Sequence, residues 1–244
     1  VWKRLAKYAN ANTPIVSVTK GIENETLLRP SQIIQEVLGN KAQVVVLSGP
    51  TIAEEIAKKM PATATAASKD ERLAGAVQET FNASYFRVYR NSDITGVELA
   101  GAMKNVIAIA AGIVDGIKIG DNAKAALLCR GLAEITRLGV ALGAKEQTFS
   151  GLSGLGDLVT TCISPMGRNR SFGQRIGKGT SVKDAIAATN SVVEGIATCK
   201  SVVDLAKKYS INMPITESVY QILFEGKSVP AAIEELMARK LKAE

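Results

Sequence analysis

The sequence predicts an α/β half followed by an all-α half, from three observations. Two short runs rich in β-branched residues, 15–19 and 44–48, have the character of buried parallel strands, and helical patterns separate them. A third strand-like run, 86–90, closes this half. After residue 93 strand signals nearly vanish and long helical patterns follow. We therefore predict two domains, at residues 1–93 and 94–244.

The elements are expected in a simple order. Residues 1–14 resemble the end of a helix already under way, so we expect the chain to begin inside a domain. After the second strand we expect a helix at 52–59, an Ala/Thr-rich run at 62–67 and a helix at 70–81. The second half should contain helices at about 96–115, 122–143, 168–177, 181–189, 194–209 and 214–224.

Composition narrows the possible functions. The chain has 244 residues, 46% of them hydrophobic, which is ample for a packed globular core. Its net charge of +7 suits an anionic partner: a phosphorylated metabolite, nucleic acid or acidic lipid. Because only 5% of the residues are aromatic, a nucleic-acid surface is disfavoured.

The sequence contains no histidine, which excludes Ser-His and Cys-His nucleophile pairs and His-ligated metals. Three widely spaced cysteines indicate neither a disulfide framework nor a zinc site, so we expect a reducing cytoplasm. No membrane span is expected, because Glu98, Lys104 and Asn105 interrupt the longest apolar run.

Lys104 and Asn105 lie together inside the apolar stretch 96–113. On a helix, the ammonium of Lys104 would emerge beside Ala100 and Gly101, which leave room for a ligand or a closely packed helix. Burial would lower the pKa of this lysine and a nearby carboxylate would raise it, so the group could exchange a proton. The alternative is a lysine that extends to water, and the local sequence leaves both open. Asn105 offers both a donor and an acceptor.

Two further stretches lie at strand ends. Lys20 follows the first strand, where open α/β sheets bind ligands, although its local sequence, taken alone, favours an exposed loop lysine. Residues 47–54 lead from the second strand through a tight turn into a helix, and Thr51 with Glu54 fits a capping box. Backbone N–H groups near Gly49 and Thr51 could face an anion.

The helical half adds an acidic and a basic candidate. Asp157, which follows Gly154 and Gly156, could cap a helix or pair with Lys104. The nearby G-x-x-G-x-G match at 151–156 follows no strand and is not a dinucleotide-binding turn. Arg168, beside Asn169 at an expected helix start, can bind a phosphate through two parallel hydrogen bonds.

In this order, seven stretches resemble the bacterial-type NAD(P)-dependent glycerol-3-phosphate dehydrogenases. They cover essentially the whole chain: SVTKGIE (17–23), LSGPTIAEE (47–55), GVELAGAMKNVIAIAAGIVDG (96–116), RGLAEITRLG (130–139), GLGDLVTTC (154–162), RNRSFG (168–173) and VVEG (192–195). The resemblance implies the C-terminal portion of a Rossmann-like nucleotide-binding domain, followed by a 6-phosphogluconate-dehydrogenase-like helical domain.

The resemblance also implies the reaction. NAD or NADP would exchange hydride reversibly with C2 of dihydroxyacetone phosphate, giving sn-glycerol 3-phosphate for phospholipid synthesis. Lys104 would accept the proton in oxidation and donate it in reduction. The implied substrate contacts are Lys20, Gly49, Thr51, Lys104, Asn105, Asp157, Arg168 and Asn169, and the implied cofactor contacts are Lys20, Ala53, Arg168, Val192 and Glu194. Apart from the resemblance, we expect a homodimer, because the hydrophobic α-helical half offers packing surface.

Two departures from the family pattern matter. Gly167 stands where family members often have serine, which removes one hydroxyl from the expected substrate site. The G-x-G-x-x-G turn does not occur in the sequence, so we expect about a third of the nucleotide-binding domain to lie outside this chain. Three alternatives stay open at this level: a related hydroxy-acid dehydrogenase, a piece of an enzyme without catalysis of its own, and a nucleic-acid-binding protein.

Overall fold

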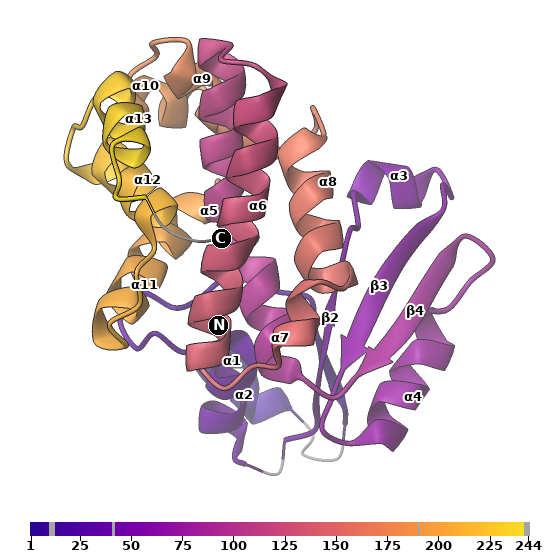
Figure 1. Cartoon of the computed structure of the whole chain (residues 1–244). Coiled ribbons are helices and arrows are strands. Elements are labelled where there is room, and N and C mark those ends of the chain that lie inside the picture. Colours follow the sequence, from indigo (N-terminus) through magenta and orange to yellow (C-terminus); the bar gives the residue numbers. More distant parts are fainter. Residues whose placement is uncertain (10–12, 41, 190, 242–244) are drawn as a thin grey trace.

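The computed structural model describes residues 1–9, 13–40, 42–189 and 191–241. A sheet and its helices form one half, and a cluster of helices forms the other (Figure 1). The long helix α5 (Ile94–Ile117) runs through the helical half, and the start of this helix packs against the sheet. In Figure 1, α8 (Asp157–Ile163) is drawn between α5 and the strands.

Within the described part of the chain, four strands form a mixed sheet in the order β1-β2-β3-β4. The strands are β1 (Ile15–Ser17), β2 (Val44–Ser48), β3 (Ala62–Ala67) and β4 (Phe86–Asn91). The first two pair in parallel with Ile15 opposite Val44, as predicted, and β3 pairs in parallel with β4. Strands β2 and β3 are antiparallel, with Val46 opposite Ala67.

Alternating side chains of the sheet pack on its two faces. Val45 and Leu47 belong to a cluster with Val77 of α4 (Glu71–Phe81), whereas Val46 packs with Val97 of α5. This alternation is the ordinary consequence of the strand's two-residue period. The sheet is therefore covered by α4 on one face and by the start of α5 on the other.

The shorter helices of the first half are α1 (Trp2–Leu5), the 3₁₀ turn η1 (Ala6–Tyr8), α2 (Pro30–Leu38) and α3 (Ala53–Ala57). The predicted capping box at Thr51 and Glu54 is wrong. Helix α3 begins later, with Ile52 as its N-cap, and the Thr51 hydroxyl donates to the Gly49 carbonyl at 3.1 Å instead. Thr51 thus belongs to the loop that follows β2.

The helical half contains nine α-helices and one π-helical turn within the described residues. They are α5, α6 (Asp121–Ala141), α7 (Glu146–Phe149), η2 (Leu152–Gly156), α8, α9 (Arg168–Gly177), α10 (Val182–Ala187), α11 (Glu194–Lys208), α12 (Pro214–Phe224) and α13 (Val229–Met237). Helices α9 and α12 match the predicted bounds. Helix α5 starts two residues before its predicted start, because the Asp93 carboxylate accepts the Gly96 N–H and caps it.

Within the described residues, α5 is the one helix whose length and hydropathy would suffice to cross a membrane. Its most apolar window is 94% buried inside the protein, so α5 is the core of the helical half. The buried Glu98 of α5 accepts hydrogen bonds from the Ser31 backbone N–H at 2.7 Å and hydroxyl at 2.6 Å. This carboxylate ties the start of α2 to the helical half.

Candidate active site

Lys104 projects from the middle of α5 and is buried, with 5% of its surface exposed. Its Nζ atom donates to Asp157 Oδ1 and, at 2.6 Å, to the Thr161 hydroxyl. Asp157 and Thr161 are one turn apart on α8 and therefore share a face of that helix. The ammonium is held by two partners on α8, and the alternative of a lysine extending to water is wrong.

Asp157 binds a second lysine with its other oxygen. Lys20, in the loop after β1, donates from Nζ to Asp157 Oδ2 at 2.6 Å and to the Gly49 carbonyl at 3.0 Å. The Asp157 side chain is 2% exposed, so one buried carboxylate lies between two ammonium groups. Pairing with lysine, the second of the two predicted roles of Asp157, is confirmed.

Gly49 shapes the loop that follows β2. Its φ is +148°, and a Cβ there would lie 3.0 Å from Ala64 Cα and from the Thr63 carbonyl oxygen. Both neighbouring atoms are backbone, so they cannot move aside as a flexible side chain would. Glycine at this position lets the loop after β2 pass close to β3 while its carbonyl faces Lys20.

The surroundings of Lys104 set its proton affinity. Burial lowers its pKa most strongly, Asp157 raises it, and the neighbouring charge of Lys20 lowers it, which brings the Lys104 pKa from 10.5 to about 8. At neutral pH the ammonium is mostly protonated, yet it gives up a proton far more readily than a lysine in water. Such a group can act as an acid in one direction and as a base in the other.

A second polar cluster lies where α5, α9 and α11 meet. Asn169 donates from Nδ2 to Asn105 Oδ1 at 3.0 Å, and its own Oδ1 accepts the Gly195 backbone N–H at 2.9 Å. Arg168 forms an ion pair with Glu194 at 3.3 Å, with half of the arginine side chain exposed. The two asparagines are buried and fixed, while the guanidinium reaches solvent and can take an anionic ligand.

These two clusters line one cavity of about 730 Å³. Nine of the predicted site residues line it: Lys20, Thr51, Ala53, Lys104, Asn105, Asp157, Arg168, Asn169 and Glu194. Gly49 contributes its carbonyl to Lys20 from just outside the lining. Val192 is 74% exposed and does not line the cavity. A cofactor contact of Val192 stays a prediction.

Sequence reasoning missed Thr161 and its cavity-lining neighbours Thr160 and Ser164. A signal for Thr161 was present, because a threonine four residues after Asp157 falls on the same helical face. This signal points to the site only when Asp157 is known to face Lys104, and the sequence does not show that contact.

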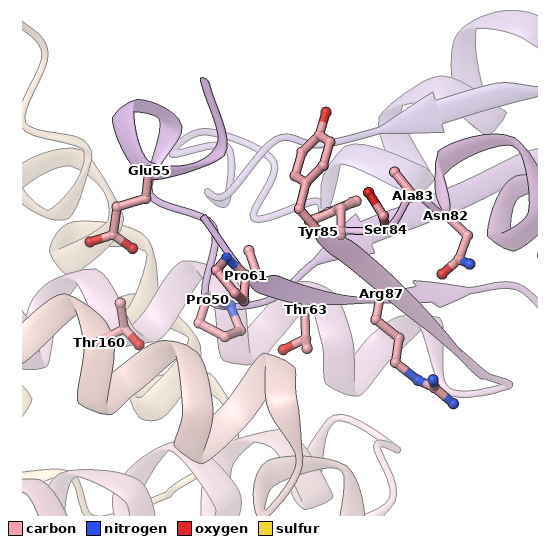
Figure 2. A pocket seen from close by; sticks show the side chains of 12 residues that line it. Pro50, Glu55, Pro61, Thr63, Asn82, Ala83, Ser84, Tyr85, Arg87 and Thr160 are labelled. Carbon is pink, nitrogen blue, oxygen red and sulfur yellow. The ribbon is translucent and has the colours of Figure 1, made fainter. Parts of the chain in front are cut away.

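A second hollow, of about 570 Å³, lies between the edge of the sheet and α8 (Figure 2). Its wall includes Pro50, Glu55, Tyr85, Arg87 and Thr160. Among the described residues, none of the predicted site residues lines this hollow, and neither Lys104 nor Asp157 reaches it. Lys20 and Lys104, which share Asp157, therefore face only the larger of these two cavities.

Comparisons with known proteins show the family of the chain. Residues 1–74 match the family model described as the NAD-dependent glycerol-3-phosphate dehydrogenase N-terminus, and residues 93–234 match that of its C-terminus. A relative named glycerol-3-phosphate dehydrogenase [NAD(P)+] from Citrifermentans bemidjiense is 54% identical over 94% of this chain and 69% of its own length. The relative of the same name from Streptomyces coelicolor is 50% identical over 95% and 69%.

A solved structure shows the same architecture. The glycerol-3-phosphate dehydrogenase of Coxiella burnetii superposes with a TM-score of 0.92 at 40% identity, covering 98% of this chain and 73% of that one. The yeast enzyme from Saccharomyces cerevisiae gives a TM-score of 0.83 at 27% identity, over 96% of this chain and 70% of that one.

Proposed function

Since the chain belongs to the NAD-dependent glycerol-3-phosphate dehydrogenase family, we propose that Lys104 is the acid/base group of its reaction. The protein is an oxidoreductase that uses NAD or NADP to interconvert dihydroxyacetone phosphate and sn-glycerol 3-phosphate. The observation that supports the role of Lys104 is its buried ammonium, paired with Asp157 and facing the cavity that the predicted site residues share.

The chemistry required of Lys104 follows from the charge that develops on the substrate. In reduction, the C2 oxygen of dihydroxyacetone phosphate becomes negative as its carbon is reduced, and the Lys104 ammonium stabilises this charge and donates the proton. In oxidation, the neutral amine accepts the proton of the C2 hydroxyl. Asp157 and Thr161 hold Nζ in place for both directions, because they bind the same nitrogen.

We assign the phosphate end of the substrate to Arg168 and Asn169. Arg168 offers a planar pair of N–H donors that matches two phosphate oxygens, and its ion pair with Glu194 is half exposed and can be exchanged. The cavity is lined by three cations and three carboxylates, so the attraction for phosphate is local and depends on Arg168, whose exposed pair with Glu194 can open to a dianionic ligand.

The cavity also fits a nicotinamide ring beside the substrate. Val18, Ile52 and Ala53 form an apolar wall at the carboxyl ends of β1 and β2, where α/β sheets bind ligands. The volume of about 730 Å³ lies within the range of sites that hold drug-sized ligands and exceeds what a three-carbon phosphate fills. Lys20, Ala53, Arg168 and Glu194 would hold the nicotinamide end of the cofactor, which supplies or accepts hydride when bound.

Several finer features belong to the same proposal. We place the product in glycerophospholipid synthesis, the protein in the cytoplasm, and the domain boundary between residues 93 and 94, where Asp93 caps α5.

We also propose that the protein forms a homodimer. Exposed side chains on α6, among them Ala126, Cys129 and Val140, offer apolar surface for it. Analytical ultracentrifugation tests the last point, since a monomer at micromolar concentration would contradict it.

A matched pair of lysine variants tests the role of Lys104 in the holoenzyme. Lys104→Met should lower kcat/KM for dihydroxyacetone phosphate about 10²- to 10⁴-fold, the usual contribution of a positioned acid/base group. Lys124→Met is the control, because Lys124 pairs with Asp115 at 2.8 Å and does not line the cavity. Near-normal reduction by a folded Lys104→Met protein would show that the assignment is wrong.

A further inference from the structure

Four glycines bring α5 and α9 into direct backbone contact. Gly112 of α5 and Gly173 of α9 leave no space for a methyl group. A Cβ at Gly112 would lie 1.9 Å from the Arg170 carbonyl oxygen, and one at Gly173 would lie 2.0 Å from that of Ile109. Real Cβ atoms do not come this close to backbone atoms, so the helix axes depend on both glycines.

The contact continues one turn further along each helix. A Cβ at Gly116 would lie 2.5 Å from the Gln174 carbonyl oxygen, and one at Gly177 would lie 2.3 Å from that of Ile113. We call Gly112, Gly116, Gly173 and Gly177 the glycine seam. Because the close contacts extend over a full turn, they fix both the separation of the two helices and their angle.

The faces of α5 and α9 that form the seam also carry cavity-lining residues, N-terminal to the seam glycines. Asn169 precedes Gly173 by four residues and therefore lies on the seam face of α9. On α5, Asn105 lies on the seam face four residues before Ile109. The hydrogen bond of 3.0 Å from Asn169 to Asn105 thus extends the helix contact into the cavity.

A third helix joins at this end. Gly195, in the first turn of α11, donates its N–H to Asn169 Oδ1 at 2.9 Å. A Cβ at Gly195 would lie 2.7 Å from the Asn105 carbonyl oxygen. Asn169 is therefore held from two sides, and its position depends on how closely the three helices approach.

We propose that the glycine seam is a positioning device that fixes the distance from Lys104 on α5 to Arg168 and Asn169 on α9. The inference rests on the proposed roles of these three residues. Lys104 is bound through Asp157 and Thr161 of α8, not through α9. Widening the seam therefore moves the phosphate-binding end of the site while the ammonium keeps its partners.

The consequence is specific to substrate binding. To accept a methyl group at residue 173, the contact must open by about 1.4 Å, from 2.0 Å to the 3.4 Å at which ordinary contact begins. Misplacement by about 1 Å can lower catalytic efficiency about 10²-fold. We expect Gly173→Ala to lower kcat/KM for dihydroxyacetone phosphate by about 10- to 100-fold, mainly through KM.

The control is another buried helix glycine that packs against α5. Gly131 of α6 contacts the Ile107 side chain, and a Cβ there would lie 2.7 Å from it. Helix α6 carries none of the residues that line the cavity, within the described residues. Gly131→Ala should therefore lower thermal stability without a comparable rise in KM.

The experiment measures three quantities for Gly173→Ala and Gly131→Ala in the holoenzyme. They are KM, the calorimetric Kd for glycerol 3-phosphate, and the pH profile of kcat. We expect KM and Kd to rise for Gly173→Ala alone, and the inflection of the profile that reports Lys104 to stay unchanged in both variants. Equal KM and Kd values in the two variants, or a shifted inflection in Gly173→Ala, would overturn the proposal.

Two further variants keep the result unambiguous. Gly116→Ala replaces Gly173→Ala if the latter does not fold, because Gly116 has the mildest clash in the seam. Gly116→Ala should also raise KM and Kd, though less than Gly173→Ala would. Unchanged values would overturn the proposal.

Arg168→Ala separates the seam from the assigned roles. If Arg168→Ala leaves the Kd for glycerol 3-phosphate unchanged, the phosphate assignment fails. If it weakens binding while Gly173→Ala binds like Gly131→Ala, the seam inference alone fails.

Discussion

Replacing Asp157 by asparagine removes the carboxylate that Lys104 and Lys20 share while nearly preserving its shape. Burial and the charge of Lys20 lower the pKa of Lys104, and Asp157 opposes both effects. Without the carboxylate, the Lys104 pKa should fall below its present value of about 8. A neighbouring opposite charge typically moves a pKa by about 1 to 3 pH units, so the inflection should move by a similar amount.

The sign of the effect differs between the two directions of reaction. Reduction needs protonated Lys104, so kcat/KM for dihydroxyacetone phosphate should be level below pH 8 and fall above it. Oxidation needs the neutral amine, so kcat/KM for glycerol 3-phosphate should rise up to about pH 8 and then level off. In Asp157→Asn both inflections should move to lower pH, and reduction at neutral pH should suffer more than oxidation.

The assay is a pH profile of kcat/KM in both directions, with Asp115→Asn as control. Asp115 is a partly buried carboxylate that pairs with Lys124 and Arg170 and does not line the cavity. Its replacement should leave the inflections where they are. The reasoning is refuted if the inflection of Asp157→Asn stays at about 8 or moves to higher pH.

Two further predictions concern binding and stability. Arg168→Lys keeps the positive charge but loses the paired N–H donors of the guanidinium. Because a hydrogen bond to a charged group is worth about 1.5 to 3 kcal/mol, KM for dihydroxyacetone phosphate should rise about 10- to 150-fold. An unchanged KM would contradict the assignment of Arg168 to the phosphate. Glu134 accepts the Ile215 and Thr216 N–H groups at the start of α12, so Glu134→Ala should lower the free energy of unfolding by about 2 to 6 kcal/mol in denaturant titrations. Full stability of Glu134→Ala would be the contrary outcome.

The sequence predicted the main helices from local patterns, and it predicted half of the residues that line the cavity, some of them, such as Ala53 and Glu194, only through the family resemblance. The apolar stretch around Lys104 indicated a buried helix, but the Asp93 cap, which starts α5 two residues earlier, was not predicted. Strand β3 was not assigned, since alanine has little preference for strands and Ala64, Ala66 and Ala67 are buried there through tertiary packing. The capping box failed for a similar reason, because the loop at Thr51 is shaped by its approach to β3.

The decisive contacts of the site join residues that are distant in the sequence. Lys104 and Asp157 are 53 residues apart, and Lys20 and Asp157 are 137 apart. From the residues alone, whether Lys104 reached water or a carboxylate was undecided, and only the packing of α8 beside α5 decides it. The glycine seam was not predicted for the same reason, because the role of a buried glycine depends on which backbone atoms lie opposite it.

The central claim is that the Lys104 amine carries the proton, and chemical rescue tests it most directly. Lys104→Ala leaves an empty side-chain volume between Asp157 and Thr161, into which a small primary amine can enter. The rate of dihydroxyacetone phosphate reduction by Lys104→Ala should rise in proportion to added ethylamine or propylamine, and the pH dependence should follow the pKa of the added amine. A folded, substrate-binding Lys104→Ala protein that is already active without amine, or whose rate no amine restores, would contradict the account.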